Sequence, residues 1–198
     1  MDTHSTKTNT RNAINNGTRQ CPGCKVVLPY QEELEYFATI GFGRYGVTSP
    51  ECLALNNEVL MKELAWERPM LARLDAYGVQ HPPHAEIQKN LKINERLVAA
   101  SKQSVAIHLI ALYLMIEKKV ELSAVSAIMD RILSSGVVLE KEALKPPADL
   151  GTIIVADVAK ATTREEHIQL VWAWSESAWN AWAAYHDTVR MWYKKYGK

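Results

Sequence analysis

The chain has 198 residues, of which 47% are hydrophobic and 23% are charged, proportions that are ordinary for a globular domain with a sizeable core. The formal net charge of +1 argues against nucleic acid and membrane surfaces as partners, and no apolar run is long enough to span a bilayer. Three cysteines are too few, and odd in number, for a secreted disulfide framework, so we expect a cytoplasmic protein.

The first part of the chain lacks the side chains needed to build a core. Residues 1–20 are rich in Thr and Asn and have almost no large apolar side chains, so we expect a disordered tail. Residues 21–198 are then expected to form a single domain. An extended stretch at 25–29 and a short helix near 34–40 follow the tail, and helical periodicity dominates after that.

The remaining elements are predicted from their start and stop signals. Ser49-Pro50-Glu51 is typical of a helix start, because Ser caps, Pro suits the first helical position and Glu complements the dipole. A second helix passes through Tyr77 and stops at His81-Pro82-Pro83. Further helices are expected over about 93–119 and 122–134, a single turn over 157–161, and one last helix from Thr162 or Thr163 to about Tyr193. The predicted fold is a mainly α helical bundle with a zinc-knuckle-like loop at its start.

The Cys21-Pro22-Gly23-Cys24 segment carries the clearest chemical signal. A Pro-Gly turn directs both sulfurs toward one point, where Zn²⁺ binds thiolates at about 2.3 Å. A thiol–disulfide pair is an alternative, but such pairs occur at helix N-termini, and the residues after Cys24 are typical of extended chain. A chance pair in a loop is a further alternative. We expect a metal knuckle, which needs two more ligands.

Cys52 and His81 are the candidates that complete this zinc site. Cys52 lies in the first turn of the helix that Ser49 caps, where the dipole stabilises a thiolate, although a free Cys is as often a small buried apolar residue. His81 lies at a helix end and is followed by proline; it is also an ordinary residue for that position. His84 is the weaker substitute. The expected ligands are Cys21, Cys24, Cys52 and His81.

Four other polar residues are candidates for catalysis: Asp75, His108, His186 and Arg190. His108 falls on the apolar face of the longest expected helix, and His186 lies one turn before Arg190. A histidine on an apolar face is more often a hydrogen-bonded core residue. If these side chains converged with His81 in a pocket of the bundle, a metal with an open position could activate water for hydrolysis, with Arg190 holding an anionic group.

Other catalytic motifs are missing from the chain. It has no Walker-type glycine loop, no Rossmann fingerprint, no His-Glu-x-x-His and no Gly-x-Ser-x-Gly.

The last expected helix is dense in tryptophan, and these side chains cover more than one face, which favours a partner surface for some of them.

Several of these segments together resemble a bacterial family catalogued as domain of unknown function 5946. The matching segments are Cys21 to Cys24, Ser49 to Cys52, Asp75 to Pro82, Gln103 to Leu109, and the Trp-rich last helix with His186, Arg190 and Trp192. The family brings no established activity. The resemblance implies that the Cys and His positions belong to one recurring pattern, which fits a shared metal site or pocket.

Two hypotheses follow. The first is a zinc-binding helical protein whose metal is structural and whose role is to bind or scaffold an unknown protein or small molecule. The second is a metal-dependent hydrolase with a His/Asp pocket in the bundle. A closed site with four protein ligands leaves no position for a substrate, so the ligand count separates the two hypotheses.

Overall fold

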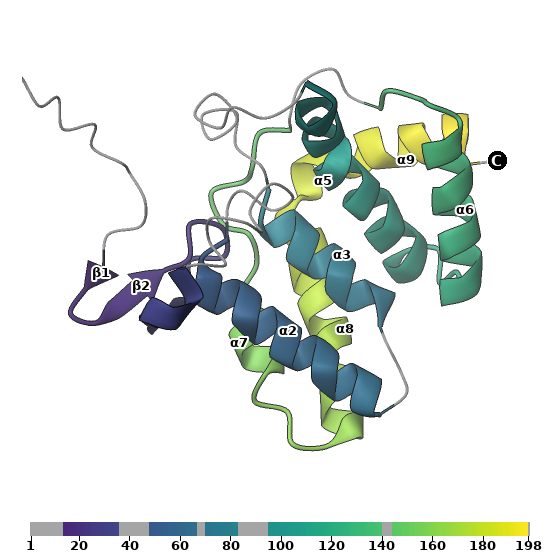
Figure 1. The fold of residues 1–198 in the computed structure, drawn as a ribbon. Helices are drawn as coiled ribbons and strands as arrows, with labels where there is room; N and C mark the ends of the chain where they lie inside the picture. The colour runs from purple at the N-terminus through teal and green to yellow at the C-terminus, as the bar shows by residue number, and fades with distance from the viewer. Residues whose placement is uncertain (1–13, 36–47, 67–69, 83–94, 140–143, 198) are drawn as a thin grey trace, which may run out of the picture.

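The computed structural model describes residues 14–35, 48–66, 70–82, 95–139 and 144–197 (Figure 1). Within these residues the protein is mainly helical, with a small antiparallel sheet at the N-terminal side, which confirms the predicted fold class. No helix in the described ranges combines the length and the apolar character needed to cross a membrane.

The sheet corrects part of the expected tail. Residues 14–20 form strands β1 (Ile14–Asn15) and β2 (Thr18–Gln20), and β2 pairs with β3 (Val27–Pro29) in the order β1-β2-β3. The strands β1 and β2 are joined by Asn16 and Gly17, whose φ values of 51° and 72° are those of a two-residue hairpin turn. Pairing with β3 therefore orders a polar segment that has little apolar surface of its own. Residues 1–13 lie outside the described residues.

The first long helix begins, and the second ends, where the sequence predicts. In α2 (Pro50–Ala65), Ser49 Oγ accepts a hydrogen bond from the Cys52 backbone N–H at 3.2 Å. Helix α3 (Leu71–Gln80) ends at His81. The expected helix near 34–40 appears as a single turn, η1 (Glu32–Leu34), and its remainder lies outside the described residues.

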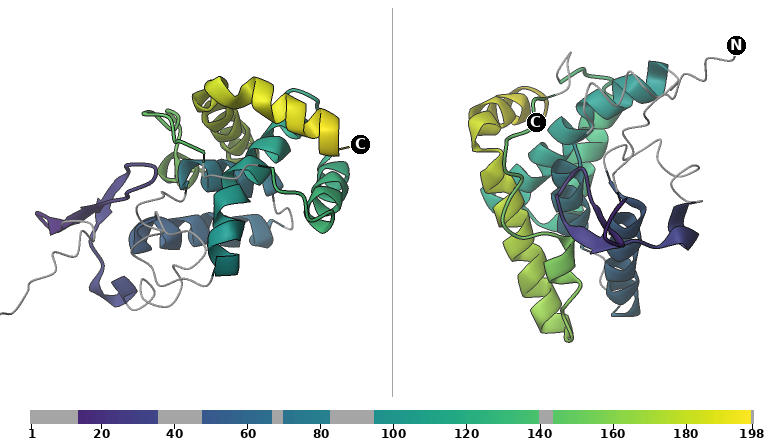
Figure 2. Two further views of the ribbon diagram at one scale, coloured as in Figure 1. Left: turned by 90° about the horizontal axis from the view of Figure 1, so that it is seen from above. Right: turned by 90° about the vertical axis from the view of Figure 1, so that its left-hand side faces the viewer.

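Helix α3 is the centre of the packing. It lies against both α5 (Glu95–Ile116) and α8 (Arg164–Ala181), as Figures 1 and 2 show. Two fully buried tryptophans clamp its end: Trp174 Nε1 donates to Gln80 Oε1 at 2.8 Å, and Trp182 Nε1 donates to the Val79 carbonyl at 3.2 Å. The outer layer is formed by α6 (Leu122–Ser134) and α9 (His186–Tyr196) on α5, and by α7 (Val155–Val158) against α2 and α8.

The prediction of one continuous last helix is wrong. It is divided into α8 and α9 by the turn η2 (Ala183–Tyr185). Trp182 leaves helical geometry with φ −92° and ψ 22°, and its indole is held by the Val79 carbonyl. The Trp179 carbonyl accepts from both the Trp182 N–H (3.0 Å) and His186 Nε2 (3.0 Å). A tertiary contact therefore ends α8, with no proline or glycine at the break.

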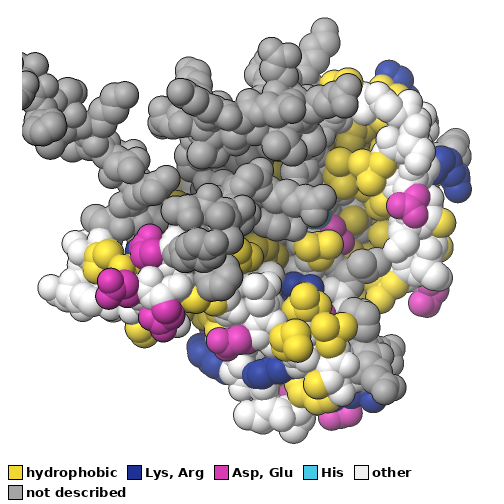
Figure 3. Space-filling view, in the orientation of Figure 1, with side chains coloured by type: hydrophobic (Ala, Val, Ile, Leu, Met, Phe, Trp, Pro, Cys, Tyr) yellow, Lys and Arg dark blue, Asp and Glu magenta, His cyan; other side chains and the backbone are white. Residues whose placement is uncertain are grey.

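Exposed large apolar side chains occur on several of the described elements, including α2 and the end of α6. Met61 and Leu64 on α2 are 62% and 49% exposed, and Leu133 and Val138 at the end of α6 are also exposed. Figure 3 shows hydrophobic side chains over both parts of the visible face.

Candidate metal centre

The knuckle between β2 and β3 turns its two cysteines inward. The Cys21 N–H donates to the Val26 carbonyl at 2.8 Å, and the Lys25 N–H donates to the Cys21 carbonyl at 3.1 Å. Lys25 has a φ of 62°, in the left-handed region, which reverses the chain after Cys24. Cys21 is fully buried and Cys24 is 8% exposed, so both sulfurs face the interior.

Cys52 reaches the same point from the first turn of α2. The Ser49 cap fixes this turn, and Cys52 is fully buried within it. The unpaired backbone N–H groups of a helix N-terminus carry partial positive charge, so this is a position where a thiolate is stabilised. The Cys52 sulfur lies 3.7 Å from Cys24 Sγ.

His81 presents one ring nitrogen to the sulfurs from the end of α3. Its Nδ1 donates to the Tyr77 carbonyl at 2.7 Å, and its Nε2 lies 3.4 Å from Cys52 Sγ. The Tyr77 ring also stacks on the imidazole, with centroids 3.9 Å apart. Because a carbonyl oxygen can only accept a hydrogen bond, this contact commits Nδ1 to carrying a proton and directs Nε2 at the thiols, as in many metal-binding histidines.

The spacing of these atoms matches a tetrahedral site. The ligand atoms of Cys21, Cys24, Cys52 and His81 all lie within 4.8 Å of one another. Bonds of about 2.3 Å to sulfur and about 2.0 Å to nitrogen separate tetrahedral ligand atoms by about 3.8 Å (S···S) and about 3.5 Å (S···N). The observed 3.7 Å between Cys24 and Cys52 and 3.4 Å between Cys52 and His81 agree with one bound ion. The cluster could therefore hold a metal.

The pKa shifts of the clustered side chains indicate where the cluster carries charge. Hydrogen bonds with Cys24 and Cys52 lower the pKa of Cys21, whereas the hydrogen bond with Cys21 raises the pKa of Cys52. Burial lowers the pKa of His81, but hydrogen bonds with Cys21 and Cys24 outweigh it and raise the pKa to about 10. Anionic charge is thus favoured at Cys21, next to a cationic His81, and a divalent metal ion can take the role of that cationic partner.

The catalytic candidates lie in two other places. His108 Nδ1 is 2.8 Å from Asp75 Oδ1, between α3 and α5, and burial raises the pKa of Asp75. Asp75 and Gly78 share one face of α3, since Gly78 lies against the His108 ring, whereas Tyr77 and His81 occupy the face that meets Cys52.

His186 and Arg190 belong to the contact between α5 and α9. The His186 ring stacks on Trp179 with centroids 3.8 Å apart, and its Nδ1 is 3.9 Å from Glu117 Oε1. Arg190 binds Glu117 with two hydrogen bonds of 2.7 and 3.1 Å. Among the described residues, His186 thus contacts Trp179 and Glu117, whereas His108 pairs with Asp75.

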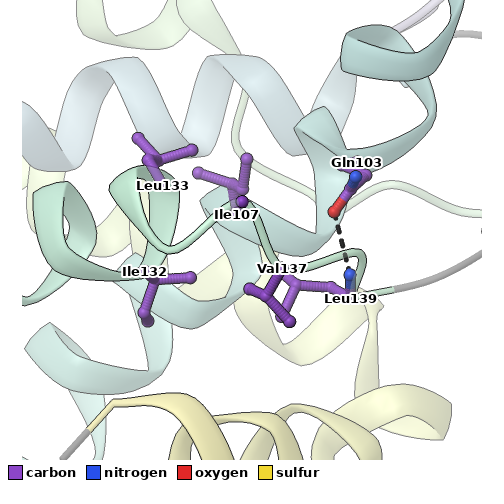
Figure 4. Close-up of a pocket in the computed structure, with 7 residues that line it drawn as sticks. Gln103, Ile107, Ile132, Leu133, Val137 and Leu139 are labelled. Carbon is purple, nitrogen blue, oxygen red and sulfur yellow. Dashed lines mark hydrogen bonds between the residues drawn. The ribbon is translucent and has the colours of Figure 1, made fainter.

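A hollow of about 240 Å³ lies between α5, α6 and the loop after α6. Its lining is uncharged, and its amide, Gln103, is already engaged because Oε1 accepts from the Leu139 N–H at 2.9 Å (Figure 4). The lining of this hollow therefore supplies no charged side chain for binding or catalysis, and the oxygen of its one amide already has a partner. The lining residues are Gln103, Ile107, Ile132, Leu133, Gly136, Val137 and Leu139.

Sequence reasoning missed the residues that support the cluster. Tyr77 is one helical turn before His81, a spacing that would have identified it. Arg19 had no such signal: it forms ion pairs with Glu35 and with buried Glu51, and so joins β2 to the first turn of α2. Among the described residues, Arg19 Nε and Glu51 Oε2 have no further hydrogen-bond partner.

A second buried polar group was also missed. Glu63 accepts from Arg73 Nε and from His167 Nε2, each at 3.1 Å, and Arg73 donates to Asn56 at 2.9 Å. Glu63 and His167 are 104 positions apart, so no local pattern could indicate their contact. The network joins α2, α3 and α8.

Comparison with protein families identifies the chain. A family of unknown function (DUF5946) matches residues 19–183, which include all four clustered side chains. The chain belongs to this family. The DUF5946 match ends just after Trp182, where α8 ends. Comparisons with curated proteins and with solved structures gave no match.

Proposed function

We propose that this DUF5946 protein binds one zinc ion through Cys21, Cys24, Cys52 and His81, and that the metal is structural. The observation that carries the proposal is the convergence of three buried sulfurs and one imidazole nitrogen at tetrahedral spacing. Thiolate and imidazole ligands favour Zn²⁺ over hard cations such as Mg²⁺ and Ca²⁺. A site closed by four protein ligands contributes folding free energy and leaves no position for a substrate.

In this role the zinc ion fastens the knuckle to two helices. The ligands come from the loop between β2 and β3, from the start of α2 and from the end of α3. The protein would then act in a reducing compartment such as the cytoplasm as a binding or scaffolding module for a protein or small molecule.

Metal analysis of the purified protein tests the zinc proposal. We expect one equivalent of zinc in the native protein and less than a tenth of that in the Cys21→Ser and Cys52→Ser variants. His81→Ala should lose zinc, whereas His84→Ala, the matched control three residues away, should retain it. Native protein without zinc, or with stoichiometric iron, would contradict the assignment. Zinc loss in His84→Ala but not in His81→Ala would show that His84, and not His81, is the fourth ligand.

The hydrogen bond between Asp75 and His108 favours a second candidate, the metal-dependent hydrolase. A carboxylate that orients an imidazole is a common arrangement for a general base. This function would need a metal with an open position and a route from the cluster to the face of α3 that carries Asp75. Hydrolysis of an activated ester or phosphoester that is abolished by both Cys52→Ser and His108→Ala would favour it over a structural metal.

A further inference from the structure

Two hydroxyl groups connect two of the clustered sulfurs. Tyr77 Oη and Thr48 Oγ1 lie 2.7 Å apart, and both residues are buried. Thr48 Oγ1 lies 3.9 Å from Cys21 Sγ, and Tyr77 Oη lies 3.9 Å from Cys52 Sγ. A chain of polar contacts thus runs from Cys21 through the two hydroxyl groups to Cys52.

The charge of the site gives these hydroxyl groups a role. Three thiolates, one neutral imidazole and Zn²⁺ add up to a net charge of −1 in a buried position. A thiolate ligand only accepts hydrogen bonds, and burying it without donors is costly. Hydroxyl donors beside the sulfurs offset that charge, and groups of this kind typically change metal affinity by about 10- to 100-fold.

We propose that Tyr77 and Thr48 form the outer hydrogen-bonding shell of the metal, donating to its thiolate ligands and setting its affinity. This inference rests on the zinc site proposed above. At 2.7 Å the two oxygens share one hydroxyl proton, which leaves the second proton for another acceptor. For Tyr77 this acceptor is Cys52 Sγ; for Thr48 it is the Ser49 carbonyl at 3.3 Å or, once the metal has removed the Cys21 proton, the Cys21 thiolate. The donor reaches Cys21 from Thr48 or Cys52 from Tyr77.

The shared proton predicts how the two residues substitute for each other. In Tyr77→Phe, the Thr48 hydroxyl is left to donate to the Cys21 thiolate of the zinc-bound site, in competition with the Ser49 carbonyl; in Thr48→Val, the Tyr77 hydroxyl still donates to Cys52. Each single variant therefore loses only the polarisation that one hydroxyl gives the other. The double variant loses every hydroxyl donor, so its loss of zinc affinity should exceed the product of the two single losses.

Zinc affinity measured by competition with a chelator tests this directly. We expect about 3-fold weaker binding for each single variant, within the modest effect of polarisation, and about 10- to 100-fold for the double variant. Tyr113→Phe is the matched control: Tyr113 is buried on α5 against Trp179 and Tyr193, and its loss should leave affinity unchanged. Thr48→Ser combined with Tyr77→Phe keeps one hydroxyl and should match Tyr77→Phe alone.

Cobalt substitution supplies a readout that altered folding would not mimic. Loss of a donor raises the energy of the sulfur lone pairs, so the sulfur-to-cobalt charge-transfer band of the double variant should move to lower energy, while its tetrahedral d–d bands remain. A double variant within twofold of the native affinity, or a loss no greater than the product of the singles, overturns the inference. Native protein that binds neither zinc nor cobalt overturns the proposed function instead.

Discussion

Gly78 illustrates how a single residue determines the contact between α3 and α5. Alanine in mid-helix ordinarily stabilises by up to about 1 kcal/mol relative to glycine. A Cβ at Gly78, however, would lie 2.3 Å from His108 Cδ2 and 2.6 Å from His108 Nε2. We predict that Gly78→Ala lowers the free energy of unfolding by about 1–3 kcal/mol, as overpacking does, measured by urea denaturation.

The control for this prediction removes the ring. In a His108→Ala background the same Gly78→Ala change has space, so its effect should become neutral or stabilising. An equal cost in both backgrounds would mean that contact with His108 is not the cause.

Gln80 is a second residue on which α3 depends. Its Nε2 donates to the carbonyls of Leu150 (3.0 Å) and Ile153 (2.7 Å), and its Oε1 accepts from Trp174. Gln80→Leu removes the partner of the buried Trp174 N–H and of two half-buried carbonyls, so we predict a loss of at least about 2 kcal/mol in the free energy of unfolding. Gln103→Leu, which removes one hydrogen bond with Leu139, is the matched control and should cost about 1 kcal/mol.

Between elements, α9 is attached to α5 by the Arg190–Glu117 pair. Hydrogen bonds from Arg190 lower the pKa of Glu117 below its usual value of 4.5. A carboxyl group with a lowered folded-state pKa adds stability above pH 4.5, and this stability is lost as the pH falls through the folded-state pKa. We predict that Glu117→Gln reduces the melting temperature at pH 7 and that the difference disappears in acid.

The size of that effect should be modest because the pair is partly exposed. A value below about 1 kcal/mol is expected, decreasing with added salt. Asp187→Asn removes the other, fully exposed partner of Arg190 and should have a smaller effect at every pH. A Glu117→Gln deficit that persists unchanged below pH 3 would point to packing in place of charge.

Elements with local signals could be predicted from the sequence, and those set by distant contacts could not. The Ser49-Pro50 start placed α2, and the apolar periodicity placed α6 (Leu122–Ser134) at its observed bounds. The break between α8 and α9 has no local breaker; it depends on the Val79 carbonyl, 103 positions from Trp182. The hairpin over 14–20 likewise requires β3 as a partner.

The candidate site follows the same division. Cys21 and Cys24 could be selected from their shared turn alone, whereas Cys52, which follows a cap, and His81, which ends a helix, could be selected only because the knuckle needs two more ligands. Thr48, in contrast, can be linked to the site only through its contact with Tyr77, 29 positions away. Glu63 accepts hydrogen bonds from residues of two other helices, which no spacing rule detects.

For the whole molecule, removal of the metal should loosen one part and leave the rest. The sheet contacts the helices mainly through α2, where the Arg19–Glu51 pair and the cluster lie. We predict that chelation increases hydrogen exchange in residues 14–29, while the buried parts of α5 and α8 remain protected. Mass spectrometry of exchanged peptides measures both regions together. Loss of protection throughout α5 and α8 would show that the metal is needed for the entire fold.

The position of His81 directly after Gln80 has a consequence for biosynthesis. All four proposed ligands emerge from the ribosome early, but the end of α3 is held by Trp174 and Trp182, which are translated about a hundred residues later. A nascent chain arrested before residue 164 would contain every ligand but lack the two tryptophans that hold the end of α3, where His81 lies. Stable zinc loading is therefore expected only once translation has passed α8.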